Sequence, residues 1–396
     1  MTRGSTKDFL SQIAGVLVYL SVFSIFADIL IGFEIHILAT ENLAPIYRSI
    51  FVIKALLCAL AIILVRKVPL NLFFWVLVLV LFSKSVFGLF SYMSFKAYLQ
   101  HLQFYIFILI GYVLGWYLWK FRVVPPINRT FISFSIYFTF LGTLVYFVLY
   151  QMGIVFYFGL GTQLFLLFAI VLVANPRASE IIFLFLAVLF TGKRSVLIIT
   201  LLQLLLPNIN FKIKSINKNA FVYAFLGVPI GISLIYFSGV AERFYPFIEL
   251  FNLYDPTDIE QNRFLTYLAT SGRSEEFFAY FIDSEIGVRE LLFGTSPGTV
   301  FYYIDLGEGG QLLQHEFFHV SFLNYIFHLG IPVGILILFF QLKVFFWTLK
   351  NLRTNNNLLS SLYIPYFLAS FFGAIVFVDI LFWILFFYNF YLSKHD

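Results

Sequence analysis

The sequence predicts an all-α, polytopic helical membrane protein, and three observations lead to that prediction. Of the 396 residues, 61% are hydrophobic and 11% are charged, whereas an ordinary soluble domain is about 25% charged. Phenylalanine alone supplies 55 residues, more apolar surface than one or two soluble cores could enclose. Apolar runs of about 20 residues recur along the chain, the length that a helix needs to cross the ~30 Å hydrocarbon layer. A soluble enzyme, a disulfide-stabilised secreted protein and a disordered chain are therefore excluded.

We expect about twelve transmembrane helices. The first apolar run follows Arg3 and Lys7, and it is longer than the apolar region of a cleavable signal peptide, which has about 7–15 residues. We therefore expect it to remain as the first helix. The expected spans are 9–33, 49–65, 68–90, 100–119, 130–150, 152–174, 178–191, 195–207, 219–238, 318–342, 359–376 and 379–393.

The placement of Lys and Arg predicts the orientation of the chain. Most of these residues stand at the ends of apolar segments, and basic residues favour the cytoplasmic side of a membrane. With the N-terminus inside, alternation leaves both termini cytoplasmic. The net charge of +5 then reflects membrane orientation, and no nucleic-acid partner is expected. The single cysteine, Cys58, permits no intrachain disulfide.

One apolar segment, 178–207, is interrupted by Thr191-Gly192-Lys193-Arg194-Ser195. A single crossing would put the lysines at 212–218 outside and the acidic loop that follows inside, against the charge rule. A turn between two short helices satisfies it. Each arm would be only about 20–23 Å long, so the turn should lie at membrane depth, where irregular backbone needs a protein or water-filled cavity beside it. Arg194, with Lys193 next to it, is a functional candidate there.

The composition changes at 239–317, which separates an N-terminal transmembrane bundle (1–238) from C-terminal transmembrane helices (318–396). This segment holds 13 of the 20 acidic residues, four arginines and no lysine. Loops of such length are usually functional. We expect it to be external and partly helical. The expected helices are 259–270, capped by Asp258, and 274–286, capped by Ser271; the expected turns are 293–298 and 307–310.

The loop arginines are candidate phosphate ligands, because a guanidinium presents a rigid bidentate fork to phosphate. The loop arginines are Arg243, Arg263, Arg273 and Arg289. The alternative for each is an ion pair with a neighbouring acid on a solvated face.

Three of the six histidines, His315, His319 and His328, cluster where the loop re-enters the membrane. The run His315-Glu316-Phe317-Phe318-His319 matches the zincin pattern, in which two histidines one helical turn apart bind zinc beside a glutamate base. A catalytic zinc needs a third protein ligand, and a membrane edge is an unusual place for this motif, so a metalloprotease is the weaker hypothesis. A histidine acid or base is favoured, with His319 first. The alternative is a histidine that only forms hydrogen bonds at the water–lipid interface and has no catalytic role.

From His319 the chain reads His-Val-Ser-Phe-Leu-Asn-Tyr-Ile-Phe-His-Leu-Gly-Ile-Pro-Val-Gly. This resembles the O-antigen polymerase and O-antigen ligase superfamily, in which a histidine at the end of a large periplasmic loop precedes a glycine by eleven residues, here Gly330. The turns around Gly294, Arg273 and Arg194 resemble further family motifs. The resemblance covers roughly 178–345. It departs at Val320, where the family usually has Asn, and at Lys193, where Ser is common.

The resemblance implies a C-type, membrane-embedded glycosyltransferase fold in the bacterial inner membrane, acting on undecaprenyl-diphosphate-linked oligosaccharides without a cofactor or catalytic metal. Arg194 and Arg273 would bind the donor diphosphate, and His319 would act at the acceptor hydroxyl. Further substrate-binding candidates are Lys193, Arg263, Arg289, His315 and Gly294.

Polymerase is favoured over ligase, because the polymerase group tolerates more drift from the His-Asn pattern. The resemblance also implies a flippase and a chain-length regulator as partners. A lipid-linked oligosaccharide flippase or other transporter is the rival from another class. It should carry charges through several spans and show inverted repeats, and neither is evident in the sequence.

Overall fold

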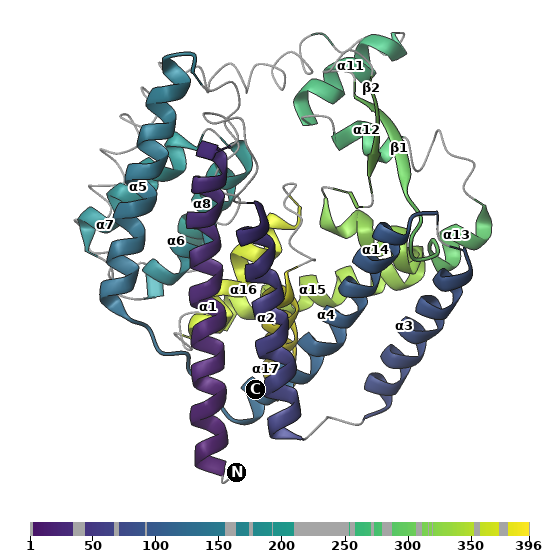
Figure 1. The fold of residues 1–396 in the computed structure, drawn as a ribbon, viewed down its shortest axis with the longest axis horizontal. Coiled ribbons are helices and arrows are strands. Elements are labelled where there is room, and N and C mark those ends of the chain that lie inside the picture. The colour runs from purple at the N-terminus through teal and green to yellow at the C-terminus, as the bar shows by residue number, and fades with distance from the viewer. Residues whose placement is uncertain are drawn as a thin grey trace.

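The computed structural model of the chain is a helical membrane protein, and its described residues include one short β-hairpin (Figure 1). Within the described part of the chain, five helices are long and apolar enough to cross a membrane. The structure describes residues 3–34, 44–66, 71–91, 93–154, 164–173, 177–191, 193–209, 253, 258–270, 273–278, 287–305, 311–315, 317–318, 320–351, 357–371 and 379–395.

The first five predicted spans are confirmed as helices, and these five helices follow one another in the sequence. They are α1 (Arg3–Phe33), α2 (Ala44–Val65), α3 (Leu72–Ser91), α4 (Phe95–Lys120) and α5 (Arg129–Gln151). Ser94 and Asn128 cap α4 and α5 through their side chains, which satisfies N–H groups that a helix start leaves unpaired.

The later apolar helices, apart from α15 with 21 residues, are shorter than the first five. They are α6 (Leu164–Val173), α7 (Ala178–Phe190), α8 (Arg194–Ile209), α14 (Ser321–Leu329), α15 (Ile331–Asn351), α16 (Leu358–Ala369) and α17 (Ile380–His395). The predicted single helix over 318–342 is wrong, because the chain breaks at Gly330, whose φ is +82°. The predicted span 219–238 lies outside the described residues, as does part of 152–174.

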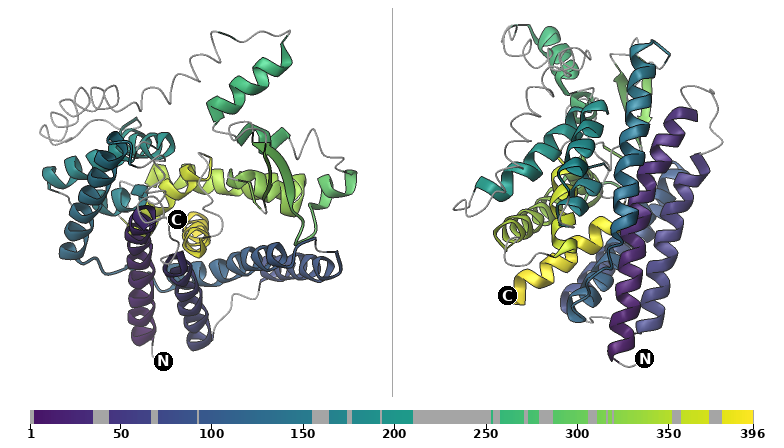
Figure 2. Two further views of the ribbon diagram at one scale, coloured as in Figure 1. Left: turned by 45° about the horizontal axis from the view of Figure 1, so that its top comes forward. Right: turned by 90° about the vertical axis from the view of Figure 1, so that its left-hand side faces the viewer.

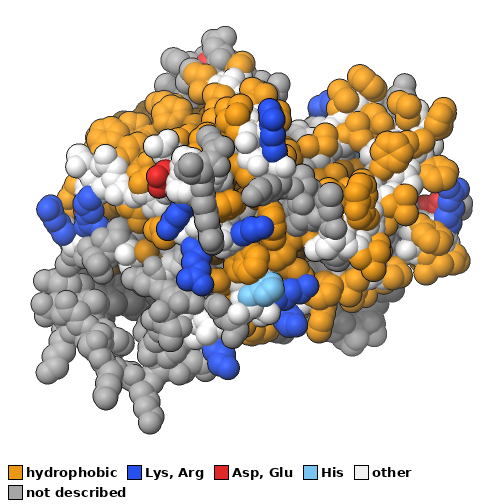
Figure 3. All heavy atoms as spheres, turned by 90° about the horizontal axis from the view of Figure 1, so that it is seen from below, with side chains coloured by type: hydrophobic (Ala, Val, Ile, Leu, Met, Phe, Trp, Pro, Cys, Tyr) orange, Lys and Arg blue, Asp and Glu red, His pale blue; other side chains and the backbone are white. Residues whose placement is uncertain are grey.

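Helix ends rich in Lys and Arg gather on the face of the molecule that holds the N-terminus. The linker between α4 and α5 packs on the first half of α1, where Ser11 Oγ donates to Val124 O at 2.5 Å and Tyr19 OH to Pro126 O at 3.0 Å. The ends of α4 and α17 meet where the rings of Trp119 and His395 stack at 4.5 Å. Viewed from this side, Lys and Arg side chains are spread over an apolar surface with few acidic ones in sight (Figure 3).

The residues predicted to be external lie at the opposite end, and the name external unit refers to that prediction. The unit formed by α11 (Ile259–Thr270), α12 (Arg273–Phe278), β1 (Phe301–Asp305) and β2 (Gln311–His315) lies beyond the helix ends, away from the N-terminus (Figures 1 and 2). This segregation of basic ends from the acidic segment is the pattern that the positive-inside rule describes.

Among the described helices, the most extensive contact lies between α4 and α17, which run parallel. A Cβ on Gly111 would lie 2.4 Å from Trp383 Cβ, and one on Gly115 would lie 2.7 Å from Phe387 Cβ. The two glycines are four residues apart, so they form a small-residue stripe that lets the helix backbones approach closely. The backbone of α17 at Trp383 and Phe387 occupies the space that the two glycines leave.

We expect Gly111→Ala to destabilise the protein by about 1–3 kcal/mol, because the added methyl overpacks this contact. The measurement is the midpoint of unfolding in mixed detergent micelles. Gly4→Ala is the matched control: Gly4 also lies in a helix, and nothing stands within 4 Å of its added Cβ. The control should keep or raise the midpoint. Equal midpoints for the two variants would contradict close packing at Gly111.

Candidate functional site

The helices of the external unit are joined by an ion pair. Arg263 of α11 donates to both carboxylate oxygens of Glu275 on α12, at 2.6–3.1 Å, and its guanidinium carbon lies 5.2 Å from the centre of the Phe278 ring. Glu275 is buried. This is the ion-pair arrangement given above as the alternative for a loop arginine, so Arg263 holds the unit together in this structure.

The start of α11 is as expected, whereas α12 is shorter than expected. The Asp258 side chain accepts from Gln261 N at 2.9 Å, which confirms the predicted cap. The helix expected over 274–286 is present as Arg273–Phe278. Residues 279–286, and the predicted cap Ser271, lie outside the described residues. Arg273 is the first residue of α12, and its side chain is also outside the described part.

The hairpin β1–β2 was not predicted, and it changes the interpretation of the histidine pair. The strands are antiparallel with Phe301 opposite His315. His315 therefore ends a strand, and the described residues Phe317 and Phe318 belong to no helix. The expectation that His315 and His319 share a helix face, as a zincin motif requires, is wrong. The side chain of His315 lies outside the described part.

The main chain on both sides of position 319 is anchored by one buried side chain. Asn324 Oδ1 accepts from Phe318 N at 2.8 Å, and Asn324 Nδ2 donates to Phe318 O at 2.7 Å and to Val320 O at 3.2 Å. The Phe318 ring stacks on Phe301 of β1, with centroids 4.3 Å apart. Ser321 N donates to Ser370 O at the end of α16. His319 itself lies outside the described residues.

Replacing Asn324 with leucine is expected to destabilise the protein by about 2–6 kcal/mol, because the buried N–H and C=O of Phe318 lose their partner, at about 1–3 kcal/mol for each group. Thermal unfolding in detergent measures the effect. Asn351→Leu is the control, since the Asn351 side chain is only half-buried and bonds to its own helix at Trp347 O. A loss in Asn324→Leu no larger than in the control would show that the anchor is dispensable.

The structure brings two sequence motifs together at the same junction. Gly294 and Gly330 both have positive φ, +73° and +82°. A Cβ on Gly294 would lie 2.6 Å from Gly330 N, and a Cβ on Gly330 would lie 2.2 Å from Leu292 O. The turn 294–298 of the external segment therefore rests backbone against backbone on the break between α14 and α15. Gly294, a predicted substrate-binding residue, makes this backbone contact in the structure, and its binding role stays a prediction.

Two polar side chains of the membrane helices hold the same turn. Lys84 Nζ, from α3, donates to Thr295 O at 3.2 Å and to His328 O at 2.5 Å. His101 Nδ1, from α4, accepts from Gly298 N at 2.9 Å. Thr295 N in turn donates to Phe327 O at 2.7 Å. The N–H groups of Thr295 and Gly298 therefore both donate hydrogen bonds within the protein.

His328 is fully buried at this junction. Its ring lies 4.2 Å from that of His101, centroid to centroid, and is surrounded by Phe104, Phe317 and Phe327. Neither of its ring nitrogens has a hydrogen-bond partner among the described residues. Sequence reasoning missed Lys84 and His101, although a lysine inside an apolar run is a signal that could have identified the first.

The predicted break within 178–207 is present. Helix α7 ends at Phe190 and α8 begins at Arg194, with Thr191 buried between them. Both helices contact α6, but α7 packs mainly on α5, whereas α8 packs on α16. Gln203 Nε2 of α8 donates to Phe165 O of α6 at 3.2 Å. Lys193 is half-buried at the break. The Arg194 side chain lies outside the described part, so its convergence with Arg273 and His319 stays a prediction.

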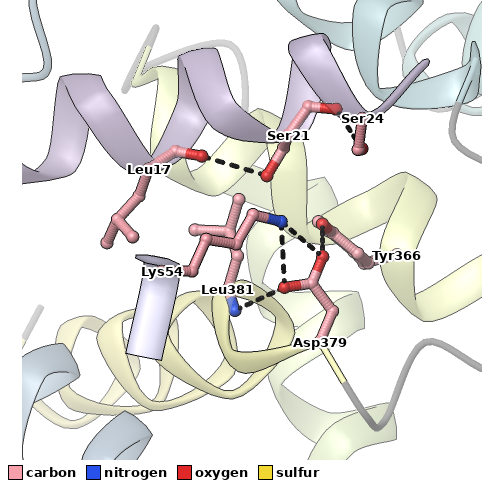
Figure 4. A network of polar contacts seen from close by, with 7 residues as sticks. All are labelled: Leu17, Ser21, Ser24, Lys54, Tyr366, Asp379 and Leu381. Atoms are coloured by element: carbon pink, nitrogen blue, oxygen red, sulfur yellow. Dashed lines mark hydrogen bonds and ion pairs between the residues drawn. The ribbon is translucent and has the colours of Figure 1, made fainter. Parts of the chain in front are cut away.

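A second polar centre lies inside the helix bundle (Figure 4). Lys54, near the middle of α2, bonds both carboxylate oxygens of Asp379 at 3.2 and 3.3 Å, and both side chains are buried. Tyr366 OH donates to the same carboxylate at 2.6 Å, as does Leu381 N at 3.0 Å, so Asp379 also caps α17. Sequence reasoning missed this pair.

Among the described residues, no group of three or more His, Cys, Asp and Glu side chains could hold a metal ion. The described part of the candidate site is the anchored segment on both sides of position 319 and the turn held by Lys84 and His101. Arg194 and Arg273 are placed only as the first residues of α8 and α12. No family model, curated protein or solved structure matches this chain.

Proposed function

We propose that this protein is a membrane glycosyltransferase that polymerises lipid-linked repeat units, transferring a growing glycan from undecaprenyl diphosphate to the next lipid-linked unit. The observation that carries the proposal is the anchoring of the chain on both sides of position 319. Phe318 packs on the external hairpin, while Val320 and Ser321 are held by Asn324 and by the end of α16. A histidine between an external unit and membrane helices is suitably placed for a substrate with a sugar headgroup and a lipid tail.

The membrane arrangement that belongs to this proposal has twelve spans and both termini in the cytoplasm of a bacterial inner membrane. The gathering of basic helix ends around the N-terminus supports it, because basic residues favour the cytoplasmic side. The external unit would then face the periplasm, where lipid-linked repeat units are joined. A flippase and a chain-length regulator would be its partners.

The proposed reaction needs two kinds of group. The acceptor hydroxyl oxygen bonds to the anomeric carbon of the donor glycan, the bond from that carbon to the diphosphate oxygen breaks, and undecaprenyl diphosphate leaves. His319 takes the hydroxyl proton as general base. Arg194 and Arg273 stabilise the charge that gathers on the departing diphosphate, because guanidinium forks match phosphate oxygens.

Arg194→Lys is expected to lose nearly as much activity as Arg194→Ala, because lysine keeps the charge but not the fork. Chain length on a polysaccharide gel, in cells that carry only the variant, measures the effect. Arg177→Lys is the matched control, since Arg177 is exposed at the other end of α7. Full-length polymer in Arg194→Lys cells would contradict bidentate binding.

A specific observation favours the transporter as second candidate. The buried Lys54–Asp379 pair joins α2 to the start of α17, and paired charges within membrane helices often mark transport pathways. Deletion of the gene separates the candidates. Loss of a polymerase leaves core plus one repeat. Loss of a ligase leaves unmodified core while lipid-linked polymer accumulates. Loss of a flippase leaves unmodified core with single lipid-linked units and no polymer.

A further inference from the structure

The short helix α13 (Val288–Phe293) carries an apolar face that the protein leaves uncovered. Val288, Leu292 and Phe293 are 73%, 47% and 65% exposed, and no residue of this helix is buried. Glu290 and Leu291, on the other side of the helix, are half-buried against the protein. Large apolar side chains grouped on a surface mark a contact with another apolar phase.

Contacts of the following turn fix α13 at the level where α3 ends and α15 begins. Its carboxyl end leads into the turn that rests on Gly330, one residue before α15. The same turn reaches the last turns of α3, where a Cβ on Gly88 would lie 2.6 Å from Pro297 Cβ. Met93 N and Ser94 N, just after α3, both donate to Gly298 O. Figure 1 shows α13 at the edge of the molecule beside the end of α3.

The apolar residues of α13 are exposed at the end of the molecule where α3 also exposes apolar side chains. Near its end α3 exposes Phe87 and Phe90, and Met93 follows; Phe90 is 84% exposed. Because α3 is one of the candidate membrane spans, its exposed side chains face lipid. Helix α13 lies beside the end of α3 (Figure 1). The lipid that covers the end of α3 can therefore also cover the exposed apolar residues of α13. Arg289, exposed on the same face, has a side chain long enough to reach headgroup phosphates while its stem stays in the apolar layer.

We propose that α13 is an interfacial lipid anchor, with Val288, Leu292 and Phe293 in the acyl boundary of the outer leaflet and Arg289 among the headgroups. Such helices lie in the plane of the interface with the apolar face buried about 5–10 Å. The anchor fixes the turn 294–298, and with it the base of the external unit, to the bilayer surface. This inference does not depend on the proposed transferase activity.

Spin labels at single cysteines test the anchor in proteoliposomes. The chain has one cysteine, so Cys58→Ala gives the background. Phe293→Cys is compared with Tyr302→Cys, which is on β1 of the external unit and 48% exposed. Oxygen concentrates in lipid and a nickel chelate stays in water, so collisions with each report the surroundings of the label. We expect position 293 to collide several-fold more often with oxygen, and several-fold less often with the chelate, than position 302.

Two results would overturn the proposal. Equal accessibility profiles at 293 and 302 would place α13 in water. An immobile label at 293 that collides with neither reagent would mean that protein, such as a second copy of the chain, covers the face instead of lipid.

Discussion

Lys54→Ala is expected to destabilise the folded protein by about 3–5 kcal/mol, because removing one partner of a buried ion pair leaves the other charge unpaired. Asp379 would keep the Tyr366 hydroxyl and the Leu381 N–H as partners, but it would lose its counter-charge in a buried site. This pair joins α2 to α17 across 325 positions of sequence, so its loss also frees the start of α17. Thermal unfolding in detergent gives the measurement.

The double variant Lys54→Met with Asp379→Leu separates a structural from a functional role for the pair. Replacing both charges by apolar groups of similar size is often neutral or stabilising, so the double variant should recover most of the stability lost in Lys54→Ala. Lys343→Ala, at an exposed lysine of α15, should change stability little. A Lys54→Ala variant as stable as the native protein would contradict the buried pair. A stable double variant that lacks function would show that the charges serve transport or catalysis.

Gly330→Ala is expected to prevent the external turn from docking. The added Cβ would lie 2.2 Å from Leu292 O and 2.5 Å from Leu292 C, distances that the backbone cannot absorb without moving the turn. The positive φ adds about 1 kcal/mol for any residue with a side chain. Moving the turn would also disturb the hydrogen bonds of Lys84 to Thr295 O and His328 O. We therefore expect the free energy of unfolding to fall by well over ~1 kcal/mol.

Gly153→Ala is the matched control for this prediction. Gly153 also has a positive φ, +72°, but nothing stands within 4 Å of its added Cβ. Gly153→Ala should therefore lose only the stability that the positive φ costs, about 1 kcal/mol. The difference between the unfolding midpoints of the two variants measures the docking contact. Equal midpoints would mean that the turn does not rest on the break between α14 and α15.

The parts of the fold that follow from local pattern could be predicted. The helices α1 to α5 came from apolar length alone, the start of α11 from the Asp258 cap, and the break before Arg194 from basic residues inside an apolar run. The break at Gly330 was missed because hydropathy runs on through 318–342, and the positive φ of a glycine leaves no hydropathy signal. The hairpin was missed although Phe301–Asp305 and Gln311–His315 flank a glycine-rich stretch, which is a hairpin signal.

The site was predicted less well, because its contacts join distant parts of the chain. A lysine such as Lys54 or Lys84 inside an apolar run can be noticed, but nothing in the sequence names Asp379 or the carbonyl of Thr295 as its partner. Arg263 was considered for phosphate, and its bidentate ion pair with Glu275 becomes visible only once α11 and α12 are packed. Gly294 and Gly330 were read as separate motifs, and the structure shows that they form one contact.

We propose above that the chain itself joins lipid-linked repeat units, with His319 as the base. Purified protein in detergent, supplied only with undecaprenyl-diphosphate-linked repeat units, tests it most directly, because no translocation is needed there. We expect lipid-linked polymer and released undecaprenyl diphosphate from the native protein, and neither from a folded His319→Ala variant. No polymer from the native protein, or equal polymer from the variant, would contradict it.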